Sequence, residues 1–299
     1  MVLTSMCVFG QARPGVYPWA ITVKIVDDLG QPVNAAKVQI GYTQGKLIEG
    51  LTETNGTFSA SRTDRSWELG IHAKKDGYYS SYISYTLYLP GQFDEQKVAS
   101  NRNATLTLVL KKVGRPIPMY AKSLNTHVPD LDKPIGYDLM VGDWIGPYGS
   151  GICADILFTG HFDKNADGES DFTLTVSFPK NGDGIQEFDV PNEAKGSGLH
   201  SPHEAPVDSY RSQWVQTDNR RPGKPIETNR NPNRNYFLRV RTVIDDRGNI
   251  VSTHYGKIYG DFMRFSYYLN PTPNSRNVEF DPKQNLMKNL KPDEGATAP

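Results

Sequence analysis

The stretch AITVKIVDDLGQPVNAAKVQIGYTQGK, residues 20–46, decides the fold class. Apolar side chains at Ile21, Val23 and Ile25 alternate with their neighbours, and the same period of two returns at Val38 and Ile40. Between the two runs lies DDLGQP, whose Asp, Gly and Pro residues favour a turn. Alternation with a period of two indicates β-strands with one buried face, so this stretch predicts two strands joined by a loop.

The same pattern continues along the chain. Asn55-Gly56 is typical of a hairpin turn, and NATLTLVLKK at 103–112 alternates again. The composition includes 27 Gly, 21 Pro and 16 Tyr, which favours many short strands separated by turns. The sequence therefore predicts an all-β protein.

The length of 299 residues suits two domains. We expect two antiparallel β-sandwiches of immunoglobulin or transthyretin type in tandem, over residues 17–112 and 121–282. The prolines in KKVGRPIPMYAK indicate a linker at 113–120. Residues 283–299 have little apolar periodicity, so we expect a C-terminal tail whose last eight or so residues are disordered.

The charge balance argues against polyanionic partners, because Lys plus Arg and Asp plus Glu number 33 each. We therefore expect no nucleic-acid partner. No run of apolar residues is long enough for a transmembrane segment. Residues 1–12 contain a short apolar stretch and a small-x-small pattern ending at Ala12, which indicates the remnant of a signal peptide. These features favour a secreted or cell-surface protein.

Three motifs in the first half carry a family resemblance. They are V-x-D-x-x-G-x-P-V-x-x-A-x-V, with Ile25 at its first position and Val38 at its last, G-x-T-x-x-x-G-x-F at Gly50–Phe58 and KDGY at Lys75–Tyr78. Residues 17–112 resemble the carboxypeptidase regulatory-like domain, a transthyretin-type β-sandwich. The resemblance implies a non-catalytic module of secreted and surface proteins.

A candidate calcium loop lies in TGHFDKNADGESDFTLTVSF, residues 159–178. Oxygen-bearing side chains occupy alternate positions around Gly168, namely Asp163, Asn165, Asp167, Glu169 and Asp171. Calcium prefers several oxygen ligands from such a loop. The spacing D-x-[DN]-x-D-G-x-x-D resembles the calcium hairpin of FG-GAP repeats, although only one copy occurs. The alternative is a solvated polar turn.

The second half offers no recognised catalytic signature. It lacks a nucleophile elbow, a phosphate-binding loop and a dinucleotide fingerprint. His200, His203 and Glu204 lie in HSPHE, where Pro202 argues against a helical zinc site. The stretch SYYLNPTPNSRNVEFDPKQNL, residues 266–286, resembles the ends of uncharacterised secreted proteins of Lentisphaerae and Verrucomicrobia. That resemblance implies no activity.

Aromatic side chains give a second candidate site. Tyr79, Tyr85, Tyr267 and Tyr268 lie in strand-like runs, where they either stack on a ligand or fill the core. The sequence as a whole favours a non-catalytic adhesion or scaffolding protein with a structural calcium ion, which contacts proteins or glycans at the cell surface or assembles with itself. A carbohydrate-binding module and a hydrolase with an unrecognised site are the alternatives.

Overall fold

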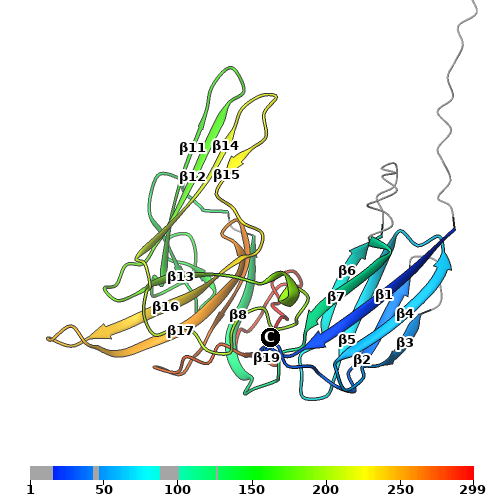
Figure 1. Ribbon diagram of the computed structural model, residues 1–299. Helices are drawn as coiled ribbons and strands as arrows, with labels where there is room; N and C mark the ends of the chain where they lie inside the picture. The colour runs from blue at the N-terminus through cyan, green and yellow to red at the C-terminus, as the bar shows by residue number, and fades with distance from the viewer. Residues whose placement is uncertain (1–15, 43–46, 88–100, 126) are drawn as a thin grey trace, which may run out of the picture. The chain divides into compact units, whose positions relative to one another are not determined.

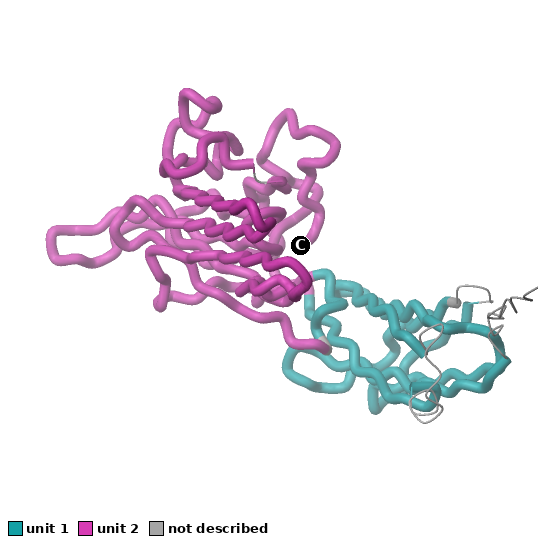
Figure 2. Tube along the Cα trace, turned by 90° about the horizontal axis from the view of Figure 1, so that it is seen from above, with its two compact units in different colours: residues 1–112, 193–198 teal, residues 113–192, 199–299 magenta. Residues whose placement is uncertain are grey.

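The computed structural model describes residues 16–42, 47–87, 101–125 and 127–299. The chain divides into two compact units (Figure 2). Unit 1 contains the described residues up to Lys112 together with Glu193–Gly198, and unit 2 contains Val113–Asn192 and Leu199–Pro299. The expected signal-peptide remnant at 1–12 lies outside the described residues. Within the part of the chain that the structure describes, no helix has the length and apolarity needed to span a bilayer.

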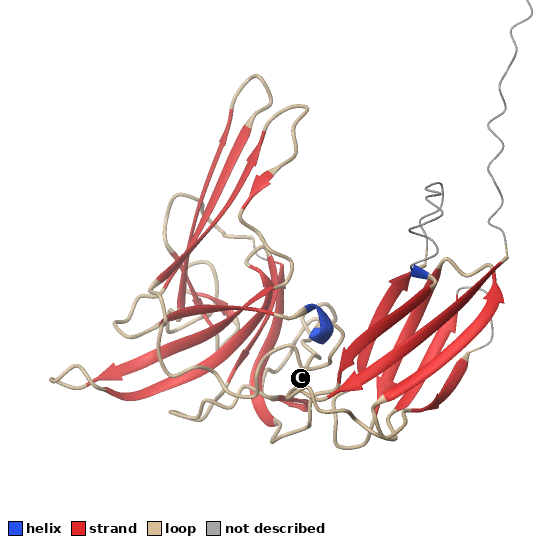
Figure 3. Ribbon diagram, in the orientation of Figure 1, coloured by secondary structure: helices blue, strands red, loops and turns tan. Residues whose placement is uncertain are grey.

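Strands make up nearly all of the regular structure in the described residues (Figure 3), so the predicted all-β class is confirmed. Unit 1 contains β1 to β7: β1 (Tyr17–Val26), β2 (Lys37–Tyr42), β3 (Ile48–Leu51), β4 (Thr57–Asp64), β5 (Glu68–Lys74), β6 (Ser81–Thr86) and β7 (Asn103–Val109) (Figure 1). They form two sheets, β4-β1-β7 and β3-β2-β5-β6. β1 is antiparallel to β4 and parallel to β7.

The core of unit 1 follows from the alternation in residues 20–46. Ile21, Val23 and Ile25 of β1 are at most 1% exposed, and they share one core with Val38 and Ile40 of the other sheet. Burying a side chain of this size stabilises a fold by about 1.5–3 kcal/mol. The two sheets are thus held together by the apolar faces that the sequence pattern predicts.

Unit 2 contains β8 to β19: β8 (Ile117–Asn125), β9 (Ile135–Asp138), β10 (Asp143–Trp144), β11 (Ile156–Lys164), β12 (Ser170–Ser177), β13 (Gly184–Asp189), β14 (Gln213–Arg220), β15 (Glu227–Thr228), β16 (Arg234–Ile244), β17 (Ile250–Asp261), β18 (Arg264–Leu269) and β19 (Phe280–Asn285). Two six-stranded sheets result, β10-β9-β11-β12-β14-β15 and β13-β16-β17-β18-β8-β19. The predicted linker at 113–120 therefore extends into a strand, because β8 begins at Ile117.

The main core of unit 2 gathers side chains from both sheets, including Phe158 and Leu174 of the first and Leu238, Ile258 and Tyr267 of the second. The second sheet also carries apolar side chains on its other face. These form two smaller clusters, one around Met119, Tyr268 and Phe280 and the other around Phe237, Tyr255 and Val278. Irregular segments supply Ala205 and Ala296 to these clusters, so the chain covers this face without a third sheet.

The C-terminal end of the described chain is packed. Ala296 is 5% exposed and belongs to the cluster around Met119 and Tyr268. The prediction that the last eight or so residues are disordered is therefore wrong. Apolar periodicity in the sequence does not reveal this packing, because a segment without a strand or helix can still bury single small side chains.

One segment of unit 1 comes from far along the chain. Residues 196–198 pair with the edge strand β6: the Tyr82 N–H donates to Gly196 O at 2.8 Å, and the Gly198 N–H donates to Ser80 O at 2.8 Å. A Cβ atom on Gly196 would collide with the Tyr82 carbonyl, so this close approach requires glycine. Unit 1 is consequently built from two separate parts of the sequence.

Candidate functional site

The candidate calcium loop is the tip of the β11–β12 hairpin, within the sheet that Figure 1 draws with β14 alongside. Asp163 pairs with Asp171, and Lys164 pairs with Ser170, so the turn proper is residues 165–169. From His161 to Gly168 all residues are exposed. The hairpin therefore carries its acidic tip into solvent, beyond the core.

A single side chain organises the turn. Asn165 Oδ1 accepts the N–H groups of Asp167 at 3.1 Å and Glu169 at 3.0 Å, and Asn165 Nδ2 donates to Glu169 Oε2 at 2.8 Å. Gly168 has φ +82°, a backbone conformation that glycine adopts without strain. The local geometry of the loop is thus explained by one asparagine and one glycine.

Three of the predicted ligands contact basic side chains, and one of them is Glu169, whose Oε1 lies 3.8 Å from Arg221 Nε. Arg221 donates to both carboxylate oxygens of Asp171, at 2.7 and 3.1 Å. Asp163 Oδ2 lies 2.8 Å from His161 Nε2, and the other ring nitrogen of His161 lies 2.5 Å from Asp132 Oδ1. Hydrogen bonds to Asp132 and Asp163 raise the pKa of His161 above its usual 6.5. Asp163 and Asp171 are exposed, and ion pairs at such exposed positions stabilise the fold little.

The five predicted ligands do not converge as they stand. Among the described residues, no group of three or more His, Cys, Asp or Glu side chains is arranged to hold a metal ion. Calcium binding at Asp163, Asn165, Asp167, Glu169 and Asp171 stays a prediction.

The four tyrosines of the second candidate site belong to different units, Tyr79 and Tyr85 to unit 1 and the other two to unit 2. Tyr267 and Tyr268 are 0% and 1% exposed, so the prediction that they stack on a ligand is wrong for this pair and they are core residues. Tyr85 lies on β6 and packs partly against the core of unit 1. Tyr79 precedes β6 and donates its N–H to Lys111 O at 2.8 Å.

The histidine loop is likewise dispersed. His203 Nε2 lies 3.8 Å from Glu279 Oε1, and the ring of His200 packs on Tyr259 at 5.1 Å between ring centroids. Glu204 forms an ion pair with Arg276 at 2.5 Å. Buried Glu279 also accepts the N–H groups of Gly114 at 2.8 Å and Arg115 at 2.7 Å. These side chains fix loops to one another.

A buried charge cluster in unit 2 was not predicted from the sequence. Arg241 donates to Asp138 at 2.8 Å and to both oxygens of Asp155 at 2.8 and 2.9 Å. Asp138 and Asp155 are 2% and 1% exposed. Asp138 stands on β9 and Arg241 on β16, so the ion pairs connect the two sheets of unit 2. We refer to these three residues as the Arg241 clamp.

Backbone groups complete the Arg241 clamp. Asp138 accepts four N–H groups, from Met140, Val141, Ile152 and Cys153. Burial alone would raise the pKa of Asp138, but the N–H groups of Val141, Cys153 and Ile152 together with Arg241 outweigh burial and lower it. The carboxylate is therefore held in its charged form while it ties two loops to β9.

A third buried carboxylate lies next to the clamp. Asp183 is 4% exposed and accepts the N–H of Arg241 at 3.1 Å and the N–H of Thr242 at 2.7 Å. These N–H groups point to Asp183 where β16 has an irregular register between Val240 and Val243 and where Arg241 has φ +57°. Burial raises the pKa of Asp183, against the opposing effect of the Thr242 hydrogen bonds.

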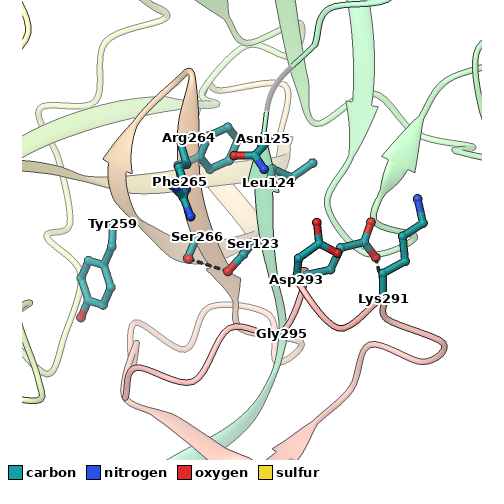
Figure 4. Close-up of a pocket in the computed structure, with 11 residues that line it drawn as sticks. Ser123, Leu124, Asn125, Tyr259, Arg264, Phe265, Ser266, Lys291, Asp293 and Gly295 are labelled. Atoms are coloured by element: carbon teal, nitrogen blue, oxygen red, sulfur yellow. Dashed lines mark hydrogen bonds between the residues drawn. The ribbon is translucent and has the colours of Figure 1, made fainter.

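A polar hollow of about 620 Å³ lies beside β8 and β18 (Figure 4). Ser123 and Ser266, which line it, form a hydrogen bond of 2.8 Å. Asp293, Glu294 and Gly295 also belong to its lining. The lining of this hollow combines hydroxyl, carboxylate and basic side chains.

The comparisons with known proteins leave the family open. No family model matches the chain, and no curated protein matches it. The resemblance of residues 17–112 to the carboxypeptidase regulatory-like domain therefore stays a prediction.

Solved structures with some likeness include 3-chlorocatechol 1,2-dioxygenase from Rhodococcus opacus, with 12% identity over 33% of this chain and 62% of that chain and a TM-score of 0.26. The major pilin subunit of Bacillus cereus has 10% identity over 88% and 99% of the two chains, with a TM-score of 0.25. A DUF3823 family protein from Parabacteroides merdae has 9% identity over 89% and 100%, with a TM-score of 0.23. The chain thus spans about three fifths of the dioxygenase. Likenesses this weak assign neither a family nor a function.

Proposed function

We propose that the chain is a non-catalytic structural protein, acting in adhesion or scaffolding, that is secreted or held at the cell surface. The observation that carries the structural role is the Arg241 clamp. Its buried ions hold two sheets and two loops of unit 2 in one arrangement. Networks of this kind rigidify a fold. The location outside the cell rests on the resemblance of residues 17–112 to a module of secreted and surface proteins.

The location can be tested on intact cells of the source organism. Brief protease treatment of whole cells should release peptides of this chain, which mass spectrometry identifies. Copies of the chain that are secreted should be found in the culture medium. Peptides recovered only after lysis would contradict the proposal. A cytoplasmic marker protein measured in the same samples controls for leakage.

Calcium binding at the β11–β12 tip is the second part of the proposal. Asp163, Asn165, Asp167, Glu169 and Asp171 would supply the oxygen ligands. To reach the ion, Asp171 and Glu169 would have to leave Arg221, and Asp163 would have to leave His161. Calcium would replace those exposed ion pairs and would make the hairpin tip more rigid.

Thermal melts of the full chain in 5 mM calcium and in a chelator test this part. Binding to the folded state alone stabilises it by about 2.7 kcal/mol at a ligand concentration 100 times Kd, so the melting temperature should rise by several degrees. Asp167→Ala should abolish the rise. Asp246→Ala, in the equivalent turn at 245–249, is the matched control and should keep it. Equal melts in both buffers would reduce the loop to a polar turn.

A further inference from the structure

The outward face of the sheet β3-β2-β5-β6 in unit 1 is flat at its centre. The apolar residues of β2 and β5 point into the core, namely Val38, Ile40, Leu69, Ile71 and Ala73. The alternate residues of both strands therefore point outward. Among them, Gly41 and Gly70 are direct partners in the ladder. Two facing glycines leave the backbone of the sheet open to other groups.

Two apolar side chains lie over these glycines. A Cβ atom on Gly70 would lie 3.1 Å from Tyr82 Oη and 3.3 Å from Tyr82 Cε2, so the ring of this β6 residue extends over β5. A Cβ atom on Gly41 would lie 3.7 Å from Leu47 Cδ1. Tyr82 is 55% exposed and Leu47 is 51% exposed, so both present surface to solvent. The electron-rich face of such a ring attracts the weakly positive C–H groups of a sugar ring.

Hydrogen-bonding side chains lie beside this apolar platform. His72 pairs with Gln39 on one side and with Tyr82 on the other, so the three side chains form one row on the outward face. Burial, and after it the charge of Lys74, lower the pKa of His72 below 6.5. The imidazole is therefore neutral at pH 7 and offers one donor and one acceptor nitrogen, which suits sugar hydroxyl groups. Gln39 Nε2 donates to Glu49 Oε2 at 3.0 Å, which orients the Gln39 side chain.

One end of this face is basic. Lys37 and Lys74 are direct partners on the outward side, and two like charges in such a position destabilise a sheet. Glu49 forms an ion pair with Lys37 at 2.9 Å. Lys37 and Lys74 also line a hollow of about 700 Å³, together with Lys75 and Asp76. These five residues carry three positive and two negative charges, so this end attracts a further anion.

We propose that this surface, which we call the Tyr82 face, is a binding site for an acidic glycan. It consists of Lys37, Gln39, His72, Lys74 and Tyr82. A uronic-acid carboxylate binds at the two lysines, a neighbouring sugar ring stacks on Tyr82, and Gln39 and His72 contact hydroxyl groups between them. Lys74 is four positions along β5 from Gly70, or about 13 Å, which suits a short oligosaccharide.

The charges of the Tyr82 face favour an acidic glycan over other ligands. Glu68, at the end of β5 far from Lys74, accepts a hydrogen bond from Ser84. The face therefore has one positive and one negative end, which directs an acidic group to the lysines. Protein interfaces have a contiguous apolar core, whereas polar side chains such as Glu49 interrupt the apolar surface here. The site rests on the adhesive role proposed above, for which it supplies a class of ligand.

The test uses the purified full chain in the presence of a chelator, so that calcium cannot bridge protein and glycan. The probes are oligosaccharides of galacturonate, mannuronate or glucuronate, each paired with its neutral, carboxyl-reduced form. Calorimetry should give a Kd of about 1 mM or below for at least one acidic probe, and about tenfold weaker binding of its neutral form. A high salt concentration should reduce this difference, because it screens the lysines.

Two pairs of variants separate the contributions. Lys74→Met should remove the preference for the acidic form, and Lys24→Met, at an exposed lysine of β1, should keep it. Tyr82→Leu leaves an apolar side chain over Gly70 but removes the flat ring, so it should weaken binding of the acidic probe about tenfold. Tyr148→Ala, at an exposed tyrosine of unit 2, should bind normally. Thermal melts check that each variant is folded.

Three results would overturn the site. They are no binding of any acidic probe, equal affinity for acidic and neutral forms, and unchanged affinity in a folded Tyr82→Leu variant. Each of them leaves the protease test on whole cells unaffected, so the failure of this site and the failure of the proposed location can be told apart.

Discussion

Two sets of carboxylates in unit 2 differ in almost every respect. The acids of the β11–β12 tip follow one another in a motif, and the side chains of Asp163 and Asp171 are 74% and 51% exposed. Asp138, Asp155 and Asp183 follow no motif and are 4% exposed or less. The first set faces water and single basic side chains, whereas the second set accepts backbone N–H groups and contacts one shared arginine, directly or through its backbone.

The difference shows that a conspicuous spacing of acids and a stabilising role are separate properties. An exposed ion pair contributes about 0–1 kcal/mol. Removing one partner of a buried pair costs about 3–5 kcal/mol, because the other charge is left without compensation in a medium of low polarity. We therefore expect the buried acids to determine the stability of unit 2, and the exposed acids to determine what its hairpin tip binds.

The strongest test of this comparison is Arg241→Met. The substitution leaves Asp138 and Asp155 buried beside each other without the guanidinium, so the free energy of unfolding should fall by about 3 kcal/mol or more. Urea unfolding followed by tryptophan fluorescence measures the loss. Arg247→Met, on the exposed turn at the end of the same hairpin, should change stability by about 0.5 kcal/mol at most. Similar losses for the two variants would break the comparison.

A pH series sharpens the comparison within the buried set. Asp138 has a lowered pKa in the folded state. Its contribution to the stability of the fold is therefore present above the pKa of the unfolded state, near 3.8, and is lost as the pH falls through the pKa of the folded state. Asp183 has a raised pKa in the folded state. Its contribution to stability is therefore present below the pKa of the unfolded state and is lost as the pH rises through the pKa of the folded state.

The two asparagine variants should therefore respond to pH in opposite directions. Asp138→Asn should cost about 1.5–3 kcal/mol at pH 7, because it loses hydrogen bonds to a charged group, and less at pH 3. Asp183→Asn should cost more at pH 3 than at pH 7. Urea midpoints measured at both pH values decide this. Parallel shifts of the two variants would show that their environments do not differ as described.

The smallest effects concern the exposed turns. The turn at 245–249 repeats the geometry of 165–169: Asp245 Oδ1 accepts the N–H groups of Arg247 at 2.9 Å and Asn249 at 2.8 Å. In a calcium-free buffer, Asn165→Ala and Asp245→Ala should each cost about 1 kcal/mol, since each removes the acceptor of two N–H groups. Thermal melts measure both. A loss at Asn165 several times that at Asp245 would mean that the acidic tip needs more than its turn hydrogen bonds.

Local signals predicted much of the fold. The alternation at Ile21, Val23 and Ile25 predicted β1 and its buried face, because a strand places alternate side chains on one side. The sequences DDLGQ at 27–31 and DDRGN at 245–249 resemble each other because both segments form the same turn. In the first, Asp27 Oδ1 accepts the N–H groups of Leu29 at 3.0 Å and Gln31 at 2.9 Å. Signals of this kind involve neighbours in sequence and are visible before folding.

The Arg241 clamp shows why the rest could not be predicted. Arg241 is 86 positions from Asp155 and 103 from Asp138, and the acids lie in stretches that look like ordinary strands and turns. β11 begins at Ile156, and Cys153, three positions before it, donates its N–H to Asp138 at 2.9 Å. Only the register of both sheets brings these groups together. The local clue is that Asp138, Asp155 and Arg241 each have apolar neighbours in the sequence.

The pairing of residues 196–198 with β6 bears on how the protein can be dissected. An edge strand with open N–H and C=O groups recruits strands from other molecules and promotes aggregation. Three residues from the distant Glu193–Gly198 segment close part of that edge. A fragment that ends at Lys112 would contain every strand of unit 1 and yet expose this stretch of β6. Fusing a short linker and residues 193–198 to such a fragment should restore its solubility.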